Sequence, residues 1–279
     1  MTNQIYPCLW FDGNAKEAAD FYCSVFSGSS VTLDTPMVVN FKLNGMKFMG
    51  LNGGPDFRFT PAISFFVLCE SISETNEVWD KLIEGGSALM SIDKYPWSER
   101  YGWLKDKYGL TWQISVVNKE GDPKKITPSF LFTNKQFGRA EEALNFYSSV
   151  FDQSNIHVKI NYPEGDPNAG KVMYSEFSIN NYGLIAMDGP GAHNYTFNEA
   201  VSFVVECANQ SAIDYYWDKL TSDGGAESRC GWLTDKFGVS WQIIPDNIGK
   251  LMSDPEKGKR VMQAVMQMKK LDIEKMINA

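Results

Sequence analysis

Apolar and polar residues alternate along this chain with two different periods, which indicates a succession of strands and helices. Residues 6–11 form an apolar run typical of a buried strand, and residues 14–26 space their apolar side chains as an amphipathic helix does. Asn14 with Glu17 three residues later has the form of a capping box, with Asn in place of the usual Ser or Thr. We therefore expect a first strand and then a helix from Asn14 to Phe26.

The same patterns predict the remaining elements of the first half of the chain. Asn44-Gly45 suits a type I′ turn between two strands. The expected elements are strands Val38–Leu43, Lys47–Leu51 and Ile63–Leu68, a helix from about Ser73 to Glu84, and a hairpin of strands Tyr101–Lys105 and Leu110–Val117. The second half repeats them as strand Ser129–Phe132, helix Gly138–Phe151, a turn at Asn180-Asn181, strand Val201–Glu206, helix Ala212–Ser222 and a hairpin around Asp235–Gly238. Each half therefore predicts βαββ followed by βαββ.

The two halves also share sequence, most clearly in the final hairpin. Gly102–Ile114 reads GWLKDKYGLTWQI, and Gly231–Ile243 reads GWLTDKFGVSWQI. Further matching blocks follow the same order: Phe21–Phe26 with Phe146–Phe151, Ile63–Val67 with Val201–Val205, and Trp79–Leu82 with Trp217–Leu220. The chain is therefore a tandem duplication. We predict a first module at 1–120, a second at 126–248 and a helical tail at 249–279.

The two copies differ in length at two places. The second copy gains residues around Tyr162–Gly170, and only the first copy carries Ser87–Arg100. Because loops absorb length changes more readily than scaffold elements, we expect both segments to be loops.

Composition limits the possible partners and the compartment. A net charge of −8 and a pI near 4.9 argue against nucleic acid or anionic membrane as the main partner. The amino terminus lacks the pattern of a signal peptide, and no segment has the length and composition of a membrane span. Five cysteines without a CxxC pair indicate reduced thiols. We expect a soluble, cytoplasmic protein.

The repeated hairpin motif, the FYxxVF block and the order of elements resemble the PhnB-like branch of the vicinal oxygen chelate superfamily. Glyoxalase I, extradiol dioxygenases and bleomycin-resistance proteins belong to the same superfamily. The resemblance implies an α+β fold of tandem glyoxalase-like modules, built from paired βαβββ units whose curled mixed sheets form cups for small molecules. In single-module relatives two chains pair to complete the sheets, which implies that a duplicated chain can do so alone. We expect a monomer or a homodimer.

Members of this branch often carry the label 3-demethylubiquinone-9 3-methyltransferase, which implies S-adenosylmethionine. A methyltransferase of the common class would need a glycine-rich loop directly after its first strand. Here the first strand is followed by Asp12-Gly13-Asn14, and Asn52-Gly53-Gly54-Pro55 reads as an ordinary loop. We therefore expect no cofactor and regard methyl transfer as the weaker interpretation.

The resemblance also gives the positions at which metal-dependent relatives hold a cation with His or Glu. They fall near Pro7 and Pro128 on the first strands, near Ala62 and Ala200 on the strands opening each second half, and at Gln113 and Gln242 on the last strands. Shifting the alignment by one or two residues brings in Tyr6, Cys8, Ser64 and Ser202 instead. Neither set supplies several imidazole or carboxylate donors, so we predict no metal site. His157 and His193 read as solvated polar groups outside any catalytic constellation.

Strand alternation predicts which side chains line the cups. If Gln113 faces the first cup, then Thr111 and Ser115 share its face, while Trp112 and Ile114 pack on the covering helix. The predicted ligand pockets comprise Gln113, Thr111, Ser64, Phe66 and Trp103, and in the second copy Gln242, Ser240, Ser202 and Trp232. The alternative is that both glutamines only satisfy polar groups in a filled core. Trp103 and Trp232 suit packing anchors as well as stacking platforms, whereas Trp79 and Trp217 read as core.

The tail from about Ser253 to Ile277 predicts one helix, with Ser253 as its N-cap and a methionine-rich apolar stripe. Docking on its own chain or across a dimer is favoured over a calmodulin-like or membrane-binding face.

Two functions from different classes remain. The first is a metal-free small-molecule-binding protein of the superfamily, with its ligand unknown. The alternative is an isomerase, lyase or dioxygenase of the same superfamily with an unrecognised metal site. A scaffold whose cups are filled by side chains is a third, weaker reading.

Overall fold

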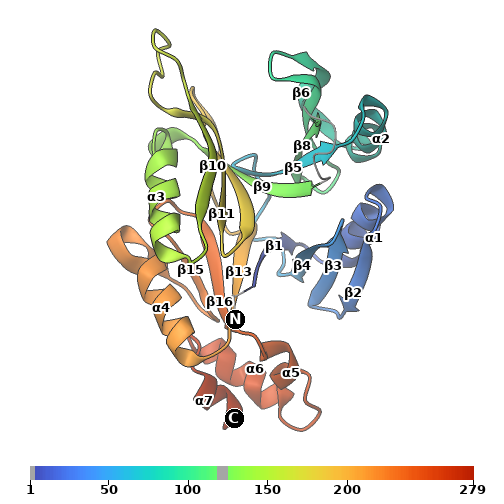
Figure 1. Ribbon diagram of the computed structural model, residues 1–279. Coiled ribbons are helices and arrows are strands. Elements are labelled where there is room, and N and C mark those ends of the chain that lie inside the picture. The colour runs from blue at the N-terminus through green and yellow to red at the C-terminus, as the bar shows by residue number, and fades with distance from the viewer. Residues whose placement is uncertain (1–3, 118–124) are drawn as a thin grey trace.

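The computed structural model describes residues 4–117 and 125–279, and its main feature is a pair of eight-stranded mixed sheets (Figure 1). Four helices cover the outer faces of the sheets, and three shorter helices lie together at the carboxyl end. The predicted α+β class of tandem glyoxalase-like units is confirmed.

The elements follow the expected order, with one more strand in each unit. The first module consists of β1 (Ile5–Phe11), α1 (Ala15–Val25), β2 (Ser30–Asp34), β3 (Val38–Leu43), β4 (Met46–Asn52), β5 (Ile63–Cys69), α2 (Ile72–Ile83), β6 (Ser87–Tyr95), β7 (Ser98–Lys105) and β8 (Thr111–Val116). The second consists of β9 (Lys125–Phe132), η1 (Asn134–Gln136), α3 (Ala140–Val150), β10 (Asn155–Asn161), β11 (Val172–Ile179), β12 (Tyr182–Asp188), β13 (Val201–Cys207), α4 (Gln210–Thr221), η2 (Ser222–Gly224), β14 (Ala226–Glu227), β15 (Trp232–Thr234) and β16 (Ser240–Pro245). The tail forms α5 (Ile248–Met252), α6 (Gly258–Gln267) and α7 (Ile273–Ile277).

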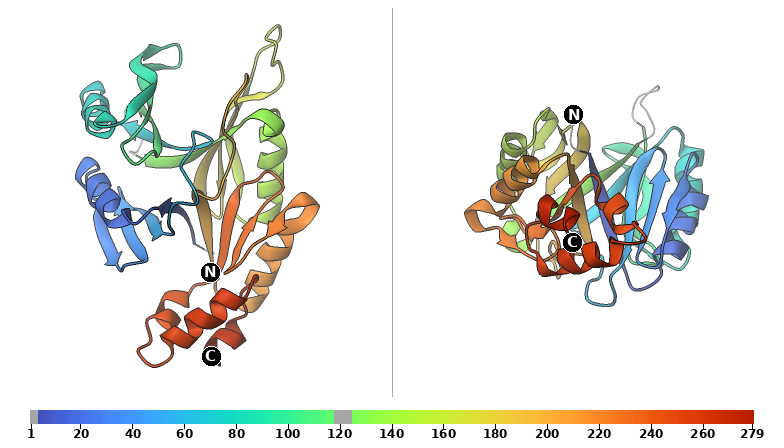
Figure 2. Two further views of the ribbon diagram at one scale, coloured as in Figure 1. Left: turned by 180° about the vertical axis from the view of Figure 1, so that it is seen from behind. Right: turned by 90° about the horizontal axis from the view of Figure 1, so that it is seen from below.

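Each sheet is shared between the two modules. Sheet A has the strand order β14-β15-β16-β13-β1-β4-β3-β2, and sheet B has the order β10-β11-β12-β9-β5-β8-β7-β6. Antiparallel pairing of β1 with β13 joins the halves of sheet A, and pairing of β5 with β9 joins those of sheet B. The two modules therefore lie side by side, each with its helices outward (Figure 2). This is the arrangement that the family resemblance implied, completed here within one chain.

The patterns missed the strands at the outer edges of the sheets. β2, β6, β10 and β14 are all edge strands, and exposed side chains dominate each of them, so that no apolar alternation marks them. The expectation of a loop at Ser87–Arg100 was wrong, because β6 and the start of β7 form a hairpin there. Tyr162–Gly170 does lie in the connection between β10 and β11, as predicted.

Asn14 is the N-cap of α1, as predicted, but the expected capping box does not form, and the predicted single tail helix is wrong. The Asn14 side chain makes no capping hydrogen bond, and the Ala15 amide donates instead to Asn52 Oδ1 at 2.9 Å. Ser253 is the C-cap of α5, and the expected single tail helix is divided into three.

The positions of several other predicted residues agree with the structure. Both residues of each predicted turn have positive φ, as a type I′ turn requires. The φ angles are 47° and 80° at Asn44-Gly45, and 47° and 63° at Asn180-Asn181. Trp79 and Trp217 are buried against the core, as expected.

The hairpin motif owes its aspartate to a buried hydrogen-bond network. Asp106 Oδ2 accepts from the Tyr22 hydroxyl and from Trp112 Nε1, both at 2.8 Å, while Oδ1 accepts from the amides of Tyr108 and Leu110. Burial raises the pKa of the Asp106 carboxyl, and these four hydrogen bonds lower it in part. Asp106 therefore joins helix α1 to the last hairpin of the module.

The second copy repeats this network. Asp235 Oδ2 accepts from the Tyr147 hydroxyl at 2.7 Å and from Trp241 Nε1 at 2.9 Å. The amides of Phe237 and Val239 donate to Oδ1. The shared FYxxVF and WLxDKxGxxWQI blocks are thus largely a structural device that fastens a helix to a hairpin.

Gly102→Ala is expected to destabilise the first module by about 1–3 kcal/mol. A Cβ at Gly102 would collide with the Trp79 ring and lie 3.0 Å from Ile92 Cα. Gly183→Ala, on β12, is the matched control, because its Cβ would meet only Thr127 Cγ2 at 4.0 Å. Urea unfolding should place the control within about 0.5 kcal/mol of the parent. Equal stability of both variants would contradict the close contact.

Candidate functional site

The two faces of each sheet carry different side chains, as strand alternation predicts. Trp112 and Ile114 are fully buried on the outer face, and the Trp112 ring lies 5.3 Å from the Tyr22 ring of α1. Gln113 faces the opposite way. The face of each sheet opposite the helices is called the inner face. The inner face of sheet A is called cup A, and the inner face of sheet B is called cup B.

This geometry corrects one part of the metal-site alignment. Pro7 pairs in register with Phe203, and Pro128 pairs with Phe65, and both phenylalanines belong to the outer-face core. Because directly opposed residues share a face, both prolines lie on the wrong face to reach a cup. The first strands offer Tyr6, Cys8, Thr127 and Ser129 to the cups instead.

A hydrogen-bonded cluster forms the centre of cup B. Gln113 on β8 donates from Nε2 to Ser64 Oγ on β5 at 2.8 Å and to Ser129 Oγ on β9 at 3.5 Å. The Tyr101 hydroxyl on β7 donates to Gln113 Oε1 at 2.7 Å. All four side chains are at most 5% exposed. The cluster therefore joins strands of both modules where they meet.

Aromatic rings lie beside this cluster. The Tyr101 ring is 6.3 Å from the Phe66 ring, 5.5 Å from Tyr95 and 5.6 Å from Trp97. Tyr95 and Trp97 stack at 5.0 Å, and Trp97 is 54% exposed. Both come from the β6–β7 hairpin, so the sequence analysis missed them by reading that segment as a loop. The residues that only the first copy carries therefore add an aromatic rim to cup B.

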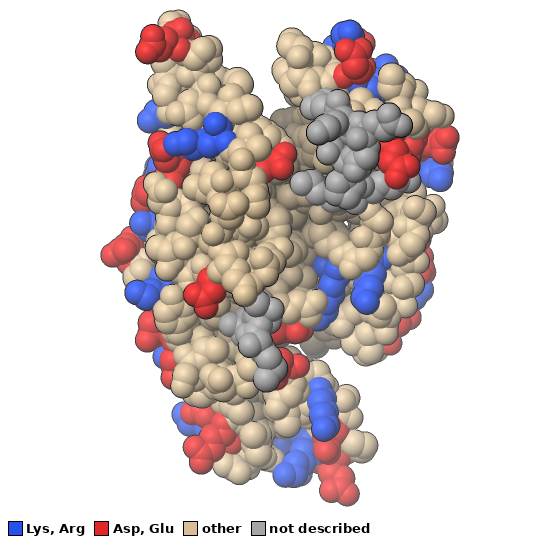
Figure 3. All heavy atoms as spheres, viewed as in Figure 1, with Lys and Arg blue, Asp and Glu red and all other residues tan. Residues whose placement is uncertain are grey.

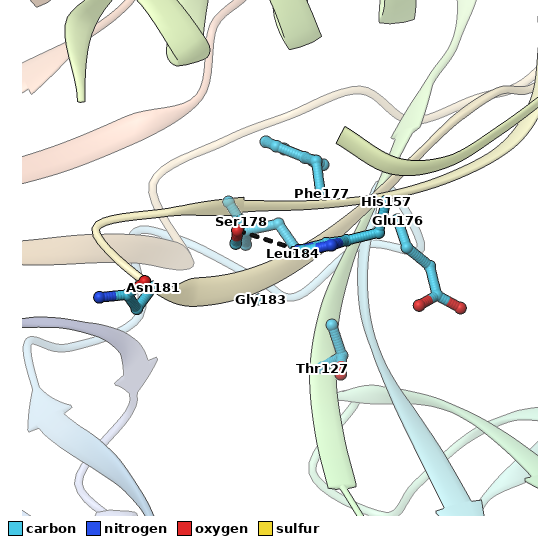
Figure 4. Close-up of a pocket in the computed structure, with 8 residues that line it drawn as sticks. All are labelled: Thr127, His157, Glu176, Phe177, Ser178, Asn181, Gly183 and Leu184. Carbon is cyan, nitrogen blue, oxygen red and sulfur yellow. Dashed lines mark hydrogen bonds between the residues drawn. The ribbon is translucent and has the colours of Figure 1, made fainter. Parts of the chain in front are cut away.

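A cavity of about 260 Å³ opens on the second-module side of cup B (Figure 4). The residues that line it are Thr127, His157, Glu176, Phe177, Ser178, Asn181, Gly183 and Leu184. Thr127 is two residues from Ser129 on the same face of β9, so the cavity adjoins the Gln113 cluster. Figure 3 shows the surface hollowed between the two arms of the molecule at this end.

His157 and Glu176 are cavity residues that the sequence did not reveal. His157 is exposed, as expected of a solvated group, but it lies on β10 instead of in a loop, and its Nε2 is 3.0 Å from Ser178 Oγ. The Glu176 carboxylate accepts from the Tyr174 hydroxyl at 2.6 Å. Ile156 pairs with Phe177 of the outer-face core, so strand alternation places His157 on the inner face, where it lines the cavity. His193 lies in a loop, as expected, and its Nε2 is 3.1 Å from the Pro190 carbonyl oxygen, which can only accept a hydrogen bond.

Cup A repeats the central cluster with one substitution. Gln242 Nε2 donates to Ser202 Oγ at 3.0 Å, and Cys8 takes the place that Ser129 has in cup B. Burial raises the pKa of the Cys8 thiol to about 12, while hydrogen bonds with Gln242 and Ser202 lower it in part. Cys8 is therefore a protonated thiol at neutral pH.

The tail covers cup A. Val261, Val265, Leu271 and Met276 are buried in one apolar cluster with inner-face residues of sheet A: Tyr6, Cys8, Val204 and Ile244. Figure 2 shows α5–α7 gathered across this end of the molecule. The prediction that the tail docks on its own chain agrees with this packing.

The tail also replaces a missing strand. The amides of Cys230 and Gly231 donate to the carbonyls of Met268 and Lys269, both at 2.8 Å. In the first module the equivalent residue Tyr101 pairs with Asp93 on β6. The second copy lost most of that hairpin, and the tail occupies its place. Cup A and cup B therefore share a glutamine and a serine at their centres. They differ at their edges, where the tail borders cup A and the β6–β7 hairpin borders cup B.

The remaining predicted pocket residues divide between the two cups. Trp103 pairs in register with Gln113, and Trp232 pairs with Gln242, so each tryptophan shares the inner face of its glutamine. The Trp232 ring packs edge-on against Trp10 at 5.9 Å. Thr111 Oγ1 donates to Ile63 O at 3.3 Å, and Ser240 is buried beside Ser202. The structure groups the nine residues as predicted, and their role in binding stays a prediction.

Groups of metal-binding side chains and membrane-spanning helices would both bear on function. Among residues 4–117 and 125–279, no group of three or more His, Cys, Asp or Glu side chains is placed to hold a metal ion. None of the helices within those ranges combines the length and the apolar character needed to span a membrane.

The family model described as 3-demethylubiquinone-9 3-methyltransferase matches this chain twice, at residues 3–115 and 124–244. The chain belongs to this family. Each match contains one copy of the repeated hairpin. The model's description names an activity, and the activity of this member is a separate question.

Solved structures are similar to this chain over one module or over most of its length. A putative 3-demethylubiquinone-9 3-methyltransferase, a PhnB protein from Bacillus cereus, is 36% identical over 40% of this chain and 98% of its own, with a TM-score of 0.38. Glyoxalase I from Zea mays is 9% identical and covers 88% of this chain and 94% of its own, with a TM-score of 0.57. At that identity the plant enzyme supports the fold alone, which is a glyoxalase-like fold. No curated protein matches the chain.

Proposed function

We propose that this family member binds a small molecule with an aromatic or apolar body in cup B, without a metal ion. The observation that carries the proposal is the buried cluster of Gln113, Ser64, Ser129 and Tyr101, with aromatic rings on one side and a cavity on the other. A few polar groups among apolar ones are the usual makeup of a small-molecule site.

The contrast between the cups supports cup B over cup A. Both cups have a glutamine and a serine at the centre, but the tail packs over Cys8 and Ile244 in cup A. The aromatic hairpin with Tyr95 and Trp97 is present only beside cup B. We therefore propose one ligand for each chain, bound near Gln113.

Chemical-shift mapping with acetophenone as the probe tests this proposal. In ¹⁵N-labelled protein, we expect the largest amide shifts at residues 64–66, 113, 127 and 129, with residues 8, 202 and 242 unchanged. Trp97→Ala should weaken binding by about 1 kcal/mol or more, because it removes a stacking face. Absence of any shift in cup B at saturating probe would overturn the proposal.

An enzyme of the same superfamily is the second candidate. The observation in its favour is that His157 and Glu176, two residue types able to bind a metal, line the same cavity. Metal analysis of the purified chain decides between the two, because stoichiometric Zn, Ni, Mn or Fe would support the enzyme and contradict the metal-free proposal. Methyl transfer is not proposed, since neither Asp12-Gly13-Asn14 nor Asn52–Pro55 provides the glycine-rich loop such enzymes use.

We also propose a reducing compartment such as the cytoplasm. All five cysteines are free thiols, and Cys8, Cys69 and Cys207 are buried.

A further inference from the structure

The hydrogen bonds within the polar cluster of cup B use only part of its donor hydrogens. The Tyr101, Ser64 and Ser129 hydroxyls carry one hydrogen each, and the Gln113 amide carries two. Three hydrogen bonds connect these side chains. Two of the five hydrogens are therefore left over.

This count does not depend on the orientation of the amide, which hydrogen-bond networks alone assign. With Oε1 toward Tyr101, the serine hydroxyl hydrogens are left over. With the amide turned, the serines donate to Oε1, and the left-over hydrogens belong to Tyr101 and to Nε2. Each hydrogen bond uses one hydrogen in either case, so the surplus is the same.

Trp103 adds a further donor to the same face. Its Nε1 is buried and has no hydrogen-bond partner in the described part of the protein. Trp103 lies directly across from Gln113 in the β7–β8 pairing. Buried donors without acceptors are costly, by about 1–3 kcal/mol each, unless water or a ligand supplies an oxygen.

We propose that cup B selects ligands whose polar end accepts hydrogen bonds without donating them, namely a carbonyl or carboxylate oxygen attached to an aromatic body. This inference rests on the proposed function of cup B. The oxygen would take the surplus hydrogens of the Gln113 cluster, and the ring would lie toward Tyr101 and the Tyr95–Trp97 stack. Because β5 pairs with both β8 and β9, donors on these three strands lie close enough to bind one ligand oxygen together.

A series of matched probes tests the proposed ligand class on the unmodified protein. Acetophenone, α-methylstyrene and benzylamine share a ring and differ at the polar end, which is an acceptor, an apolar group and a cationic donor. We expect acetophenone to bind cup B about tenfold more tightly than either of the others, measured by amide shifts near Gln113. Benzoate in place of acetophenone reports whether the favoured oxygen is charged.

Gln113→Glu supplies the sharper test. A carboxylate accepts from Tyr101, Ser64 and Ser129 together, which leaves no surplus hydrogen and adds a negative charge. The preference should then reverse, with acetophenone weakened and benzylamine strengthened by about tenfold each. Gln242→Glu, the same change beneath the tail, is the matched control and should leave the preference of cup B unchanged.

The outcomes separate this inference from the proposed function. Equal binding of all three probes in cup B, or an unchanged preference in folded Gln113→Glu, would overturn the acceptor class and leave the binding site intact. Failure of every probe to bind cup B would overturn both. If Gln113→Glu does not fold, the wild-type series alone decides, since a preference for benzylamine contradicts the proposal.

Discussion

Leu271→Ala is expected to lower the free energy of unfolding by about 2–5 kcal/mol, the usual cost of truncating a fully buried leucine. Leu271 is fully buried where the tail crosses sheet A. A Cβ placed at Gly231 would lie only 3.2 Å from Leu271 Cδ1, which shows how closely the tail approaches β15. Urea unfolding followed by tryptophan fluorescence measures the change.

The same substitution should also expose cup A. Cys8 lies beneath the tail, and burial keeps the pKa of its thiol near 12, so iodoacetamide should label Cys8 slowly at pH 8 in the parent. Leu271→Ala should speed the labelling of Cys8, since the thiolate forms only where water reaches it. Ile277→Ala is the control, because Ile277 is 47% exposed on the same tail. Equal labelling in both variants would mean that the tail does not close cup A.

Asp106→Asn is expected to cost about 1–3 kcal/mol of stability. Asn Oδ1 still accepts from the amides of Tyr108 and Leu110, but its Nδ2 would face the Trp112 indole N–H, a donor against a donor. The Trp112 donor would then be buried without an acceptor. Thermal or urea unfolding gives the difference directly.

The second copy provides the comparison for this prediction. Asp235→Asn should cost a similar amount, because Tyr147 and Trp241 repeat the same contacts. The two sites share no partner, so their effects should add in the double variant. Asp80→Asn, exposed on α2, should stay within about 0.5 kcal/mol of the parent. A loss no greater at Asp106 than at Asp80 would contradict the proposed role of the motif.

The sequence predicted most of the scaffold because its signals are local and repeated. Alternation around Gln113 correctly assigned Trp112 and Ile114 to the core, since side chains on a strand must alternate. The duplicated hairpin identified the fold through residues that hold it together. The role of Asp106 was hidden because its partner Tyr22 lies far away in the sequence.

The features that distinguish the two cups could not be predicted from local sequence patterns. β6 is an edge strand with exposed side chains, so its hairpin read as a loop, and the aromatic rim formed by Tyr95 and Trp97 was missed with it. His157 lies on the edge strand β10, whose side chains are all exposed, so no apolar alternation marked its segment as a strand. The tail has an apolar stripe, but the surface that it covers is formed by strands from both modules. Those contacts exist only once the chain has folded.

A crystal structure of the full chain grown with acetophenone tests the central claim most directly. The account predicts density for one probe in cup B, with its oxygen near Gln113 and its ring toward Tyr101, and with the tail in place over cup A. Density beside Gln242 with the tail displaced, and none beside Gln113, would contradict it.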